Sequence, residues 1–139
     1  MSRATTYGYD LSGNLVEKTM PNGVVEERVH DGRNRVSTLQ NLVAVGEGGL
    51  SEYAYGYDAA GNVMQVVESY PGGSLAGRTI TNTYDGIYRL VNEQIATSGV
   101  GTVTTGYTYD KGHNRVNKTE TGGAVPEIIT VAMPVAPVD

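Results

Sequence analysis

Short stretches rich in Val, Thr and Tyr alternate along the chain with clusters of Gly, Pro, Asn and Asp. Within the stretches, side chains of one kind recur at every second position, as in Tyr53, Tyr55 and Tyr57, which is the period of a β-strand with two unlike faces. The predicted strands are residues 5–10, 14–20, 24–30, 35–44, 51–57, 62–70, 78–84, 89–97, 102–109 and 114–121. The pattern therefore predicts an all-β chain.

One dipeptide marks the end of every second predicted strand. Tyr-Asp stands at residues 9–10, 57–58, 84–85 and 109–110, and His30-Asp31 is a degenerate copy. The aspartates of these copies are separated by 21, 27, 27 and 25 residues. A period of this size is typical of a repeat that cannot bury its own apolar face and must stack on its neighbours. The repeat therefore indicates a structural protein.

Each copy has the residues of a three-residue hairpin loop. An Asp at the first position of a type I turn accepts backbone N–H groups, and a residue with positive φ is expected three positions later. Gly13 and Gly61 suit that position, and Asn34 and His113 tolerate it. Tyr88 fits it poorly, so we expect either local strain or a different loop in that copy.

The loop length predicts which residues face each other across each hairpin. For the residue before the aspartate, the expected pairs are Tyr9/Leu15, His30/Val36, Tyr57/Val63, Tyr84/Leu90 and Tyr109/Arg115. For the aspartate itself, they are Asp10/Asn14, Asp31/Arg35, Asp58/Asn62, Asp85/Arg89 and Asp110/Asn114. Because Asn and Arg alternate strictly in the second set, we expect adjacent hairpins to form a larger unit of two.

A second family of turn residues lies between the Tyr-Asp copies, at residues 21–23, 46–49, 71–73, 98–101 and 122–123. Asn22-Gly23 between two apolar stretches is among the strongest short hairpin signals. Since the two turn families alternate, residues 1–123 are predicted to form an antiparallel meander of repeat hairpins, a coiled, open or spiralling β-sheet strip. A sheet of so many strands is expected to curl.

Residues 124–139 form an apolar tail with prolines that departs from the repeat. Its apolar run, residues 128–133, has no Tyr-Asp partner. We interpret it as either an ordinary edge strand or a strand that pairs with another subunit. The edge strands are in either case the expected contacts with other copies or with neighbouring repeats.

Composition narrows the possible partners. The net charge is −5 at pH 7 and no Lys/Arg cluster offsets it, which disfavours nucleic acids and anionic membranes. The chain has no cysteine, so disulfides and thiolate metal sites are excluded, and no stretch approaches transmembrane length. No signal peptide is visible, and we interpret the chain, which starts inside a repeat, as a fragment or a processed product.

The residues that suggest catalysis or metal binding are explained by the repeat. His30 and His113 occupy positions of the turn template, whereas a metal or acid–base site needs adjacent groups and a third ligand. The segment from Asp10 to Asn14 is faintly similar to a calcium loop, but the loop's twelfth position, normally Glu, is Pro21. The aspartates already cap turns, so catalysis by paired carboxylates is not expected. We predict no catalytic residue, no metal site, no cofactor and no enzymatic activity.

The repeat resembles the RHS/YD-repeat family. Residues 9–15 and 57–63 are similar to its Tyr-Asp-x-x-Gly-Asn motif, and residues 30–36 and 84–90 to an Arg-bearing variant. The resemblance covers about residues 5–121 and implies a β-sheet strip that spirals into a hollow shell. In bacterial toxin complexes and Rhs effectors that shell encloses a toxic cargo; in teneurins it belongs to a cell-surface adhesion protein. The shells of the family contain many more repeats, and the Asp-Pro-x-Gly motif associated with self-cleavage is absent here.

Two functions follow as expectations. The first is a secreted, toxin-associated scaffold that assembles with further repeats or copies into an extracellular shell or a filament. The second is a module at the cell surface that binds a glycan or a protein through its tyrosine-rich face. In both, the chain is extracellular or at the cell surface and is not inserted in a membrane.

Overall fold

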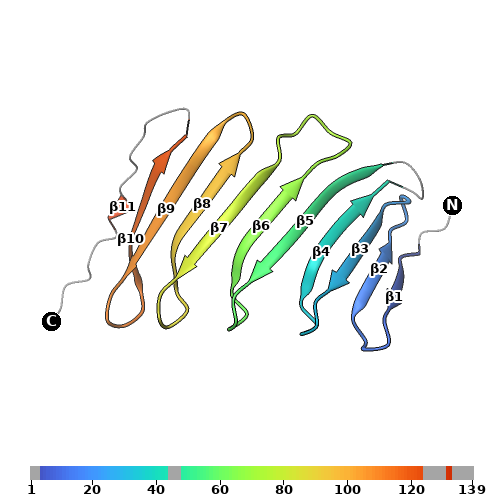
Figure 1. Ribbon diagram of the computed structural model, residues 1–139, viewed down its shortest axis with the longest axis horizontal. Coiled ribbons are helices and arrows are strands. Elements are labelled where there is room, and N and C mark those ends of the chain that lie inside the picture. The colour runs from blue at the N-terminus through green and yellow to red at the C-terminus, as the bar shows by residue number, and fades with distance from the viewer. Residues whose placement is uncertain (1–3, 44–47, 124–130, 133–139) are drawn as a thin grey trace. The chain divides into compact units, whose positions relative to one another are not determined.

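The computed structural model describes residues 4–43, 48–123 and 131–132. The chain divides into two compact units, residues 1–77 and 78–139, and each is an antiparallel meander (Figure 1). Unit 1 contains, in spatial order, β1 (Thr6–Tyr9), β2 (Leu15–Thr19), β3 (Val25–His30), β4 (Val36–Leu42), β5 (Gly49–Tyr57) and β6 (Val63–Ser69). Unit 2 contains β7 (Arg78–Tyr84), β8 (Leu90–Thr97), β9 (Gly101–Tyr109), β10 (Arg115–Gly122) and β11 (Val131–Ala132).

The all-β antiparallel meander is confirmed. Every predicted strand is present, with bounds within two residues of the expected ones. Val131–Ala132 adds one short strand, β11, which pairs with Asn117 and Lys118 of β10. The remaining residues of the tail lie outside the described residues, so its role as an edge strand or an inter-subunit strand stays a prediction.

The cross-hairpin register also agrees with the sequence. All five expected pairs are observed, from Tyr9 opposite Leu15 to Tyr109 opposite Arg115. One step further from each turn the register shifts, because the second strand carries one extra residue, a β-bulge that the sequence pattern did not reveal. In the first hairpin, for example, Gly8 faces Glu17, which leaves Val16 without an opposite residue. Bulges of this kind increase the local twist of a sheet.

All five Tyr-Asp turns adopt the same loop. In each one, the backbone N–H of the residue three after the aspartate donates to the aspartate's carbonyl oxygen at 3.0–3.2 Å. In each one, the aspartate N–H donates to the carbonyl four residues later at 2.8–3.0 Å. Tyr88 is no exception, because it has φ of +67°, beside +99° at Gly61 and +59° at Asn34. The alternative that this copy forms a different loop is therefore wrong. The other alternative, local backbone strain, agrees with the positive φ of Tyr88.

The second turn family is confirmed where it is described. Around Asn22-Gly23, the Met20 N–H donates to the Val24 carbonyl at 2.8 Å and Gly23 has φ of +85°, which is again a three-residue hairpin loop. At residues 98–101, the Val100 N–H donates to the Thr97 carbonyl at 3.1 Å. Residues 46 and 47 of the predicted turn 46–49 lie outside the described residues.

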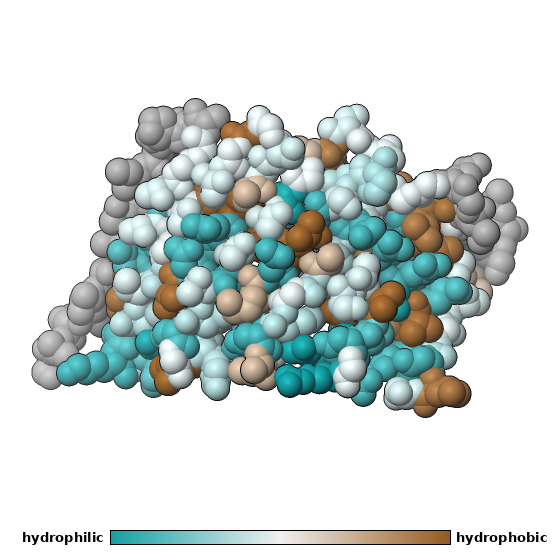
Figure 2. Space-filling model, in the orientation of Figure 1, coloured by the Kyte–Doolittle hydropathy of each residue, from teal (hydrophilic) through white to brown (hydrophobic). Residues whose placement is uncertain are grey.

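Neither unit has a hydrophobic core within its described residues. No described hydrophobic side chain is buried, and the two buried residues there are polar, Glu68 and Thr105. Hydrophobic and hydrophilic residues are interspersed on the face drawn in Figure 2. Each unit is therefore a thin sheet held by its backbone ladders, its cross-strand pairs and its turns, and the turns position the groups discussed below.

Candidate functional site

The recurrent polar groups of the chain converge at the Tyr-Asp turns. In every turn one carboxylate oxygen of the aspartate accepts the backbone N–H of the residue four positions later, at 2.8–3.0 Å. The other carboxylate oxygen accepts the side chain of that same residue, Asn or Arg, at 2.7–3.1 Å. The predicted Asp/Asn and Asp/Arg pairs are thus all formed, and both oxygens of each aspartate are engaged within its own turn.

These hydrogen bonds favour the ionised carboxylates. The side-chain donation from Arg35, followed by its backbone N–H, lowers the pKa of Asp31 from 3.8 to about 2. The Asn side-chain amide is the largest cause that lowers the pKa of Asp10, Asp58 and Asp110, and the Arg89 backbone N–H is the largest cause at Asp85. A general acid needs the opposite shift, toward neutral pH, and none of the five turn aspartates shows it.

The two kinds of turn contact the next hairpin through different groups: the Asn14 amide donates to the Asn34 side-chain oxygen at 3.1 Å, whereas the turn arginines lie over a tyrosine ring. We call β3–β4 and β7–β8 Arg-type hairpins, and β1–β2, β5–β6 and β9–β10 Asn-type hairpins, after the partner of the aspartate. In the Arg-type hairpin β3–β4, the Arg35 guanidinium lies over the ring of Tyr57 in the next hairpin, 4.3 Å from its centroid. The same guanidinium donates to the carbonyl of Asp58 at 3.3 Å, and the Tyr57 hydroxyl donates back to the carbonyl of Val36 at 2.7 Å.

The same contact recurs in unit 2. The Arg89 guanidinium lies 4.5 Å from the centroid of the Tyr109 ring, and the Tyr109 hydroxyl donates to the Leu90 carbonyl at 2.7 Å. Arg89 Nη1 also lies 3.3 Å from His113 Nδ1 in the next turn. We name the pairs Arg35–Tyr57 and Arg89–Tyr109 the Arg–Tyr latches. They join an Arg-type hairpin to the Asn-type hairpin that follows it.

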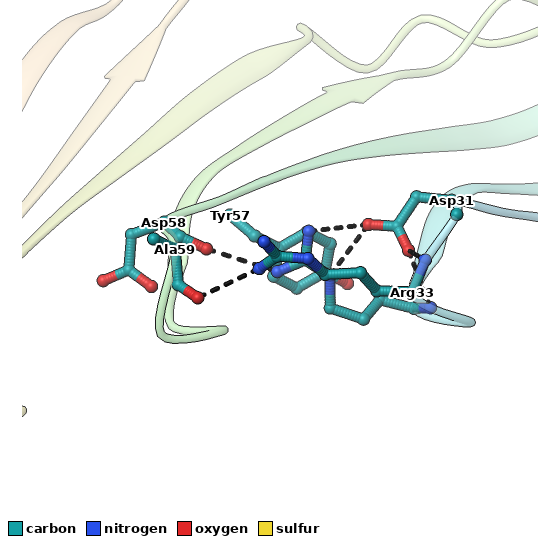
Figure 3. A pocket seen from close by; sticks show the side chains of 7 residues that line it. Asp31, Arg33, Tyr57, Asp58 and Ala59 are labelled. Carbon is teal, nitrogen blue, oxygen red and sulfur yellow. Dashed lines mark hydrogen bonds and ion pairs between the residues drawn. The ribbon is translucent and has the colours of Figure 1, made fainter.

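The first latch lies beside an open hollow of about 560 Å³ between two turns, lined by Asp31, Gly32, Arg33, Arg35, Tyr57, Asp58 and Ala59 (Figure 3). Arg33 extends across it and donates to the Ala59 carbonyl at 3.0 Å. Arg35 is tied to Asp31 by contacts of 2.7 and 2.8 Å. The charged groups that line the hollow are therefore hydrogen-bonded to side chains or backbone of the two turns.

The residues that the sequence suggested for catalysis or metal binding each have a different set of contacts. His30 ends β3, and its Nδ1 is buried with no hydrogen-bond partner among the described residues. His113 holds the positive-φ position of its turn and contacts Arg89. Asp10, the first residue of the calcium-like segment, uses its oxygens for Ser12 and Asn14. Within the ranges 4–43, 48–123 and 131–132, no three His, Cys, Asp or Glu side chains gather as metal ligands would.

Among the described residues of unit 1, one carboxylate is buried. Glu68 is 7% exposed and accepts a hydrogen bond from the Tyr70 hydroxyl at 3.1 Å, which raises the pKa of Tyr70. Its neighbour across the hairpin is Tyr53. This cluster was not singled out in the sequence, where its only trace is a glutamate among Val and Tyr.

Sequence reasoning missed the role of two tyrosine hydroxyls. The pairing of Tyr57 and Tyr109 with opposite aliphatic or Arg residues was expected, but their bonds to Val36 and Leu90 were not. A signal exists in retrospect. In all three Asn-type hairpins the first strand ends with Tyr-x-Tyr, at residues 7–9, 55–57 and 107–109. The first strand of neither Arg-type hairpin ends in this way.

No protein-family model matches the chain, and no curated protein matches it. Solved structures do. The chain is similar to the crystal structure of TcdB2-TccC3-Cdc42, with a TM-score of 0.80 and 17% identity over 94% of this chain. It is also similar to TcdB2-TccC3-TEV, with a TM-score of 0.76 and 17% identity over 94% of this chain. A mutant of the Photorhabdus luminescens Tc holotoxin pore matches with a TM-score of 0.75 and 17% identity over 91% of it.

The chain has the fold of a Tc toxin segment. It spans about 7% of the length of each matched chain. The resemblance to the RHS/YD-repeat family, first seen in the turn motifs, is thereby confirmed at the level of the fold. No helix in the described part of the chain is long and apolar enough to span a membrane.

Proposed function

We propose that the chain is a non-catalytic structural segment, a YD-repeat β-scaffold that pairs with further repeats or copies to build an extracellular shell or filament. The observation that carries the proposal is the engagement of both oxygens of every turn aspartate within its turn, together with the latches between hairpins. The recurrent polar residues thus hold strands in place. The similarity to Tc toxin structures supports the scaffold role and a location outside the cell.

The thinness of each unit supports assembly. A sheet with no buried hydrophobic side chain among its described residues gains little from its own packing, so neighbouring repeats would stabilise it. A shell made of many such segments would enclose a cargo, and the partners we propose are other repeats, other copies and that cargo. Nucleic acid and membrane lipid are not proposed as partners, given the net charge of −5.

Sedimentation velocity and electron microscopy of the purified chain test the proposal. We expect self-association through strand edges, or association once further repeats are supplied. Deletion of residues 124–139 should block assembly if the tail is the inter-subunit strand, and should leave it intact if the edges alone suffice. A stable, well-folded monomer at high concentration, with or without the tail and with or without added repeats, would contradict the scaffold function.

The non-catalytic part of the proposal has its own test. Asp58→Asn replaces a carboxylate whose oxygens accept the Asn62 amide at 2.7 Å and two backbone N–H groups at 2.8 Å. We expect no hydrolase activity in either protein against a panel of ester, glycoside and peptide substrates. Hydrolase activity that is present in the unmodified chain and lost in a folded Asp58→Asn variant would show that the aspartates are catalytic.

A second candidate function is a binding module for a glycan or a protein. The observation that favours it is the exposure of Tyr7 and Tyr9 on β1, at 55% and 63%. Exposed aromatic rings with polar tips are common in binding surfaces. Binding to a glycan array that disappears in a folded Tyr7→Ser/Tyr9→Ser variant would favour this function over the scaffold.

A further inference from the structure

The two Arg–Tyr latches share one geometry. In each, the Arg guanidinium is held by the aspartate of its own turn, at 2.8 Å for Arg35 and 2.7 Å for Arg89. One face of the guanidinium then covers the tyrosine ring of the following Asn-type hairpin, at 4.3 and 4.5 Å. The tyrosine hydroxyl donates a hydrogen bond to the backbone carbonyl of the residue after the arginine, at 2.7 Å in both units. The latch is therefore a property of the repeat, since it occurs in each unit.

The third Asn-type hairpin, β1–β2, has the receiving half of a latch without the arginine. Tyr9 follows Tyr7-Gly8 as Tyr57 follows Tyr55-Gly56. Among the described residues, however, β1 pairs only with β2, so no Arg-type hairpin lies against it (Figure 1). The Tyr9 side chain is accordingly 63% exposed, whereas Tyr57 and Tyr109 are half-buried under their arginines.

We infer that the β1 edge, with Tyr9, Tyr7 and the Asp10 carbonyl, is a docking surface for an Arg-type Tyr-Asp hairpin. The incoming hairpin adds its second strand antiparallel to β1, as β4 adds to β5. Its arginine covers the Tyr9 ring and donates to the Asp10 carbonyl, which corresponds to the Asp58 carbonyl of the first latch. The Tyr9 hydroxyl donates to the backbone carbonyl of the residue after that arginine. This inference rests on the proposed scaffold function and names the class of repeat that the scaffold accepts at this edge.

The chemistry of the edge selects this occupant. An Asn-type hairpin has Asn at the position from which Arg35 and Arg89 cover a ring of the next hairpin, as at Asn62. The arginine that follows this position in β9–β10, Arg115, lies over Tyr107 of its own hairpin, 5.4 Å from the ring centroid. A second folded copy of this chain cannot supply the hairpin either. Its Arg-type hairpins have their second strands paired on both sides, β4 with β3 and β5, and β8 with β7 and β9. The occupant is therefore an Arg-type hairpin whose second strand is free.

A tandem fusion tests the inference on the complete chain. Joining a copy of residues 25–48 to Met1 places the added Arg35 ahead of Tyr9 by the 22 residues that separate Arg35 from Tyr57. The matched control carries Arg35→Asn in the added copy alone, and Asn is the residue that three of the five turns have at this position. A third protein combines the intact added hairpin with Tyr9→Leu. The native Arg35–Tyr57 latch remains in all three as an internal reference for folding.

The measurements are amide hydrogen exchange of β1 and proton NMR of the arginine side chains. We expect the added Arg35 to show contacts with the Tyr9 ring and the β1 amides to exchange more slowly by roughly tenfold or more, because several hydrogen bonds and a cation–π contact are added together. The Arg35→Asn control and the Tyr9→Leu protein should lose the arginine–ring contact and a measurable part of the protection, while the native latch stays unchanged.

Each outcome decides between the two proposals. If the fusion and its Arg35→Asn control protect β1 equally, the selection for an Arg-type hairpin is wrong, but edge pairing and the scaffold function stand. If neither added hairpin protects β1 while the native latch is intact, both the docking surface and edge assembly at β1 are wrong. Protection that depends on the added arginine and on Tyr9 supports the inference.

Discussion

The shared turn geometry makes the left-handed residue of each loop the most informative position for mutation. Gly61 has φ of +99° and no heavy atom within 4 Å of the place where a side chain would begin. Gly61→Val therefore introduces backbone strain with no steric clash. A left-handed conformation costs an L-residue about 1–2 kcal/mol, and more for a β-branched one, so the free energy of unfolding should fall by at least about 1 kcal/mol.

The reverse change removes strain that is already present. Tyr88 has φ of +67° and a side chain that is 64% exposed, so Tyr88→Gly should relieve about 1–2 kcal/mol of backbone strain. Glycine also lowers the stability by about 0.5–1 kcal/mol, because it increases the conformational entropy of the unfolded chain. The net result should range from neutral to about 1.5 kcal/mol of stabilisation.

Gly86→Val is the matched control. Gly86 lies two residues before Tyr88 in the same kind of turn, has open space around it and does not have positive φ. Urea unfolding followed by far-ultraviolet circular dichroism, with the unmodified chain measured in parallel, gives the free energies of unfolding. If Gly61→Val and Tyr88→Gly destabilise the chain equally, or if Gly86→Val costs as much as Gly61→Val, the assigned turn geometry is refuted.

Two further predictions follow from the same contacts. Tyr57→Phe should lower the free energy of unfolding by about 1 kcal/mol, because it deletes the 2.7 Å hydrogen bond to the Val36 carbonyl. Tyr9→Phe should change the free energy of unfolding very little, because the Tyr9 ring is 63% exposed. Equal effects of the two substitutions in urea unfolding would mean that the latch hydroxyl contributes nothing. Because folding lowers the pKa of Asp31 from 3.8 to about 2, its contribution to stability is complete above the unfolded value and is lost as the pH falls through the folded one. Stability measured in urea should therefore fall between about pH 4 and pH 2, and Asp31→Asn should be less stable near neutral pH and lose less on acidification; an Asp31→Asn profile parallel to that of the unmodified chain would count against this role.

Much of the fold could be predicted because its determinants are local. The three-residue loop follows from the turn preferences of Asp10 and Gly13, and a loop of known length sets the opposite residues with no long-range information. The bulges were not predictable, since residues such as Val16 have the same strand preference as their paired neighbours. At Tyr88 the local preference pointed away from the observed loop, and the strand pairing on both sides of that turn overrode it.

The candidate contacts between hairpins were predictable only in outline. The alternation of Asn and Arg after the aspartates indicated a unit of two hairpins, and the structure shows what the alternation does. Arg35 and Asp31 are four residues apart, so their bond is a local event, whereas Tyr57 comes 22 residues after Arg35 and belongs to another hairpin. Which ring receives the guanidinium depends on the order and offset of neighbouring strands.

The amino-acid sequence by itself therefore determined the strands, the turns and the registers across the Tyr-Asp turns. The tertiary structure decided which hairpin contacts which, where the bulges lie, and that Tyr9 is exposed while Tyr57 is covered. The physical reason is the separation along the sequence of the residues that interact. Turn hydrogen bonds form between residues a few positions apart and depend on local conformation, whereas a stack between hairpins needs two strands from separate repeats to be paired first.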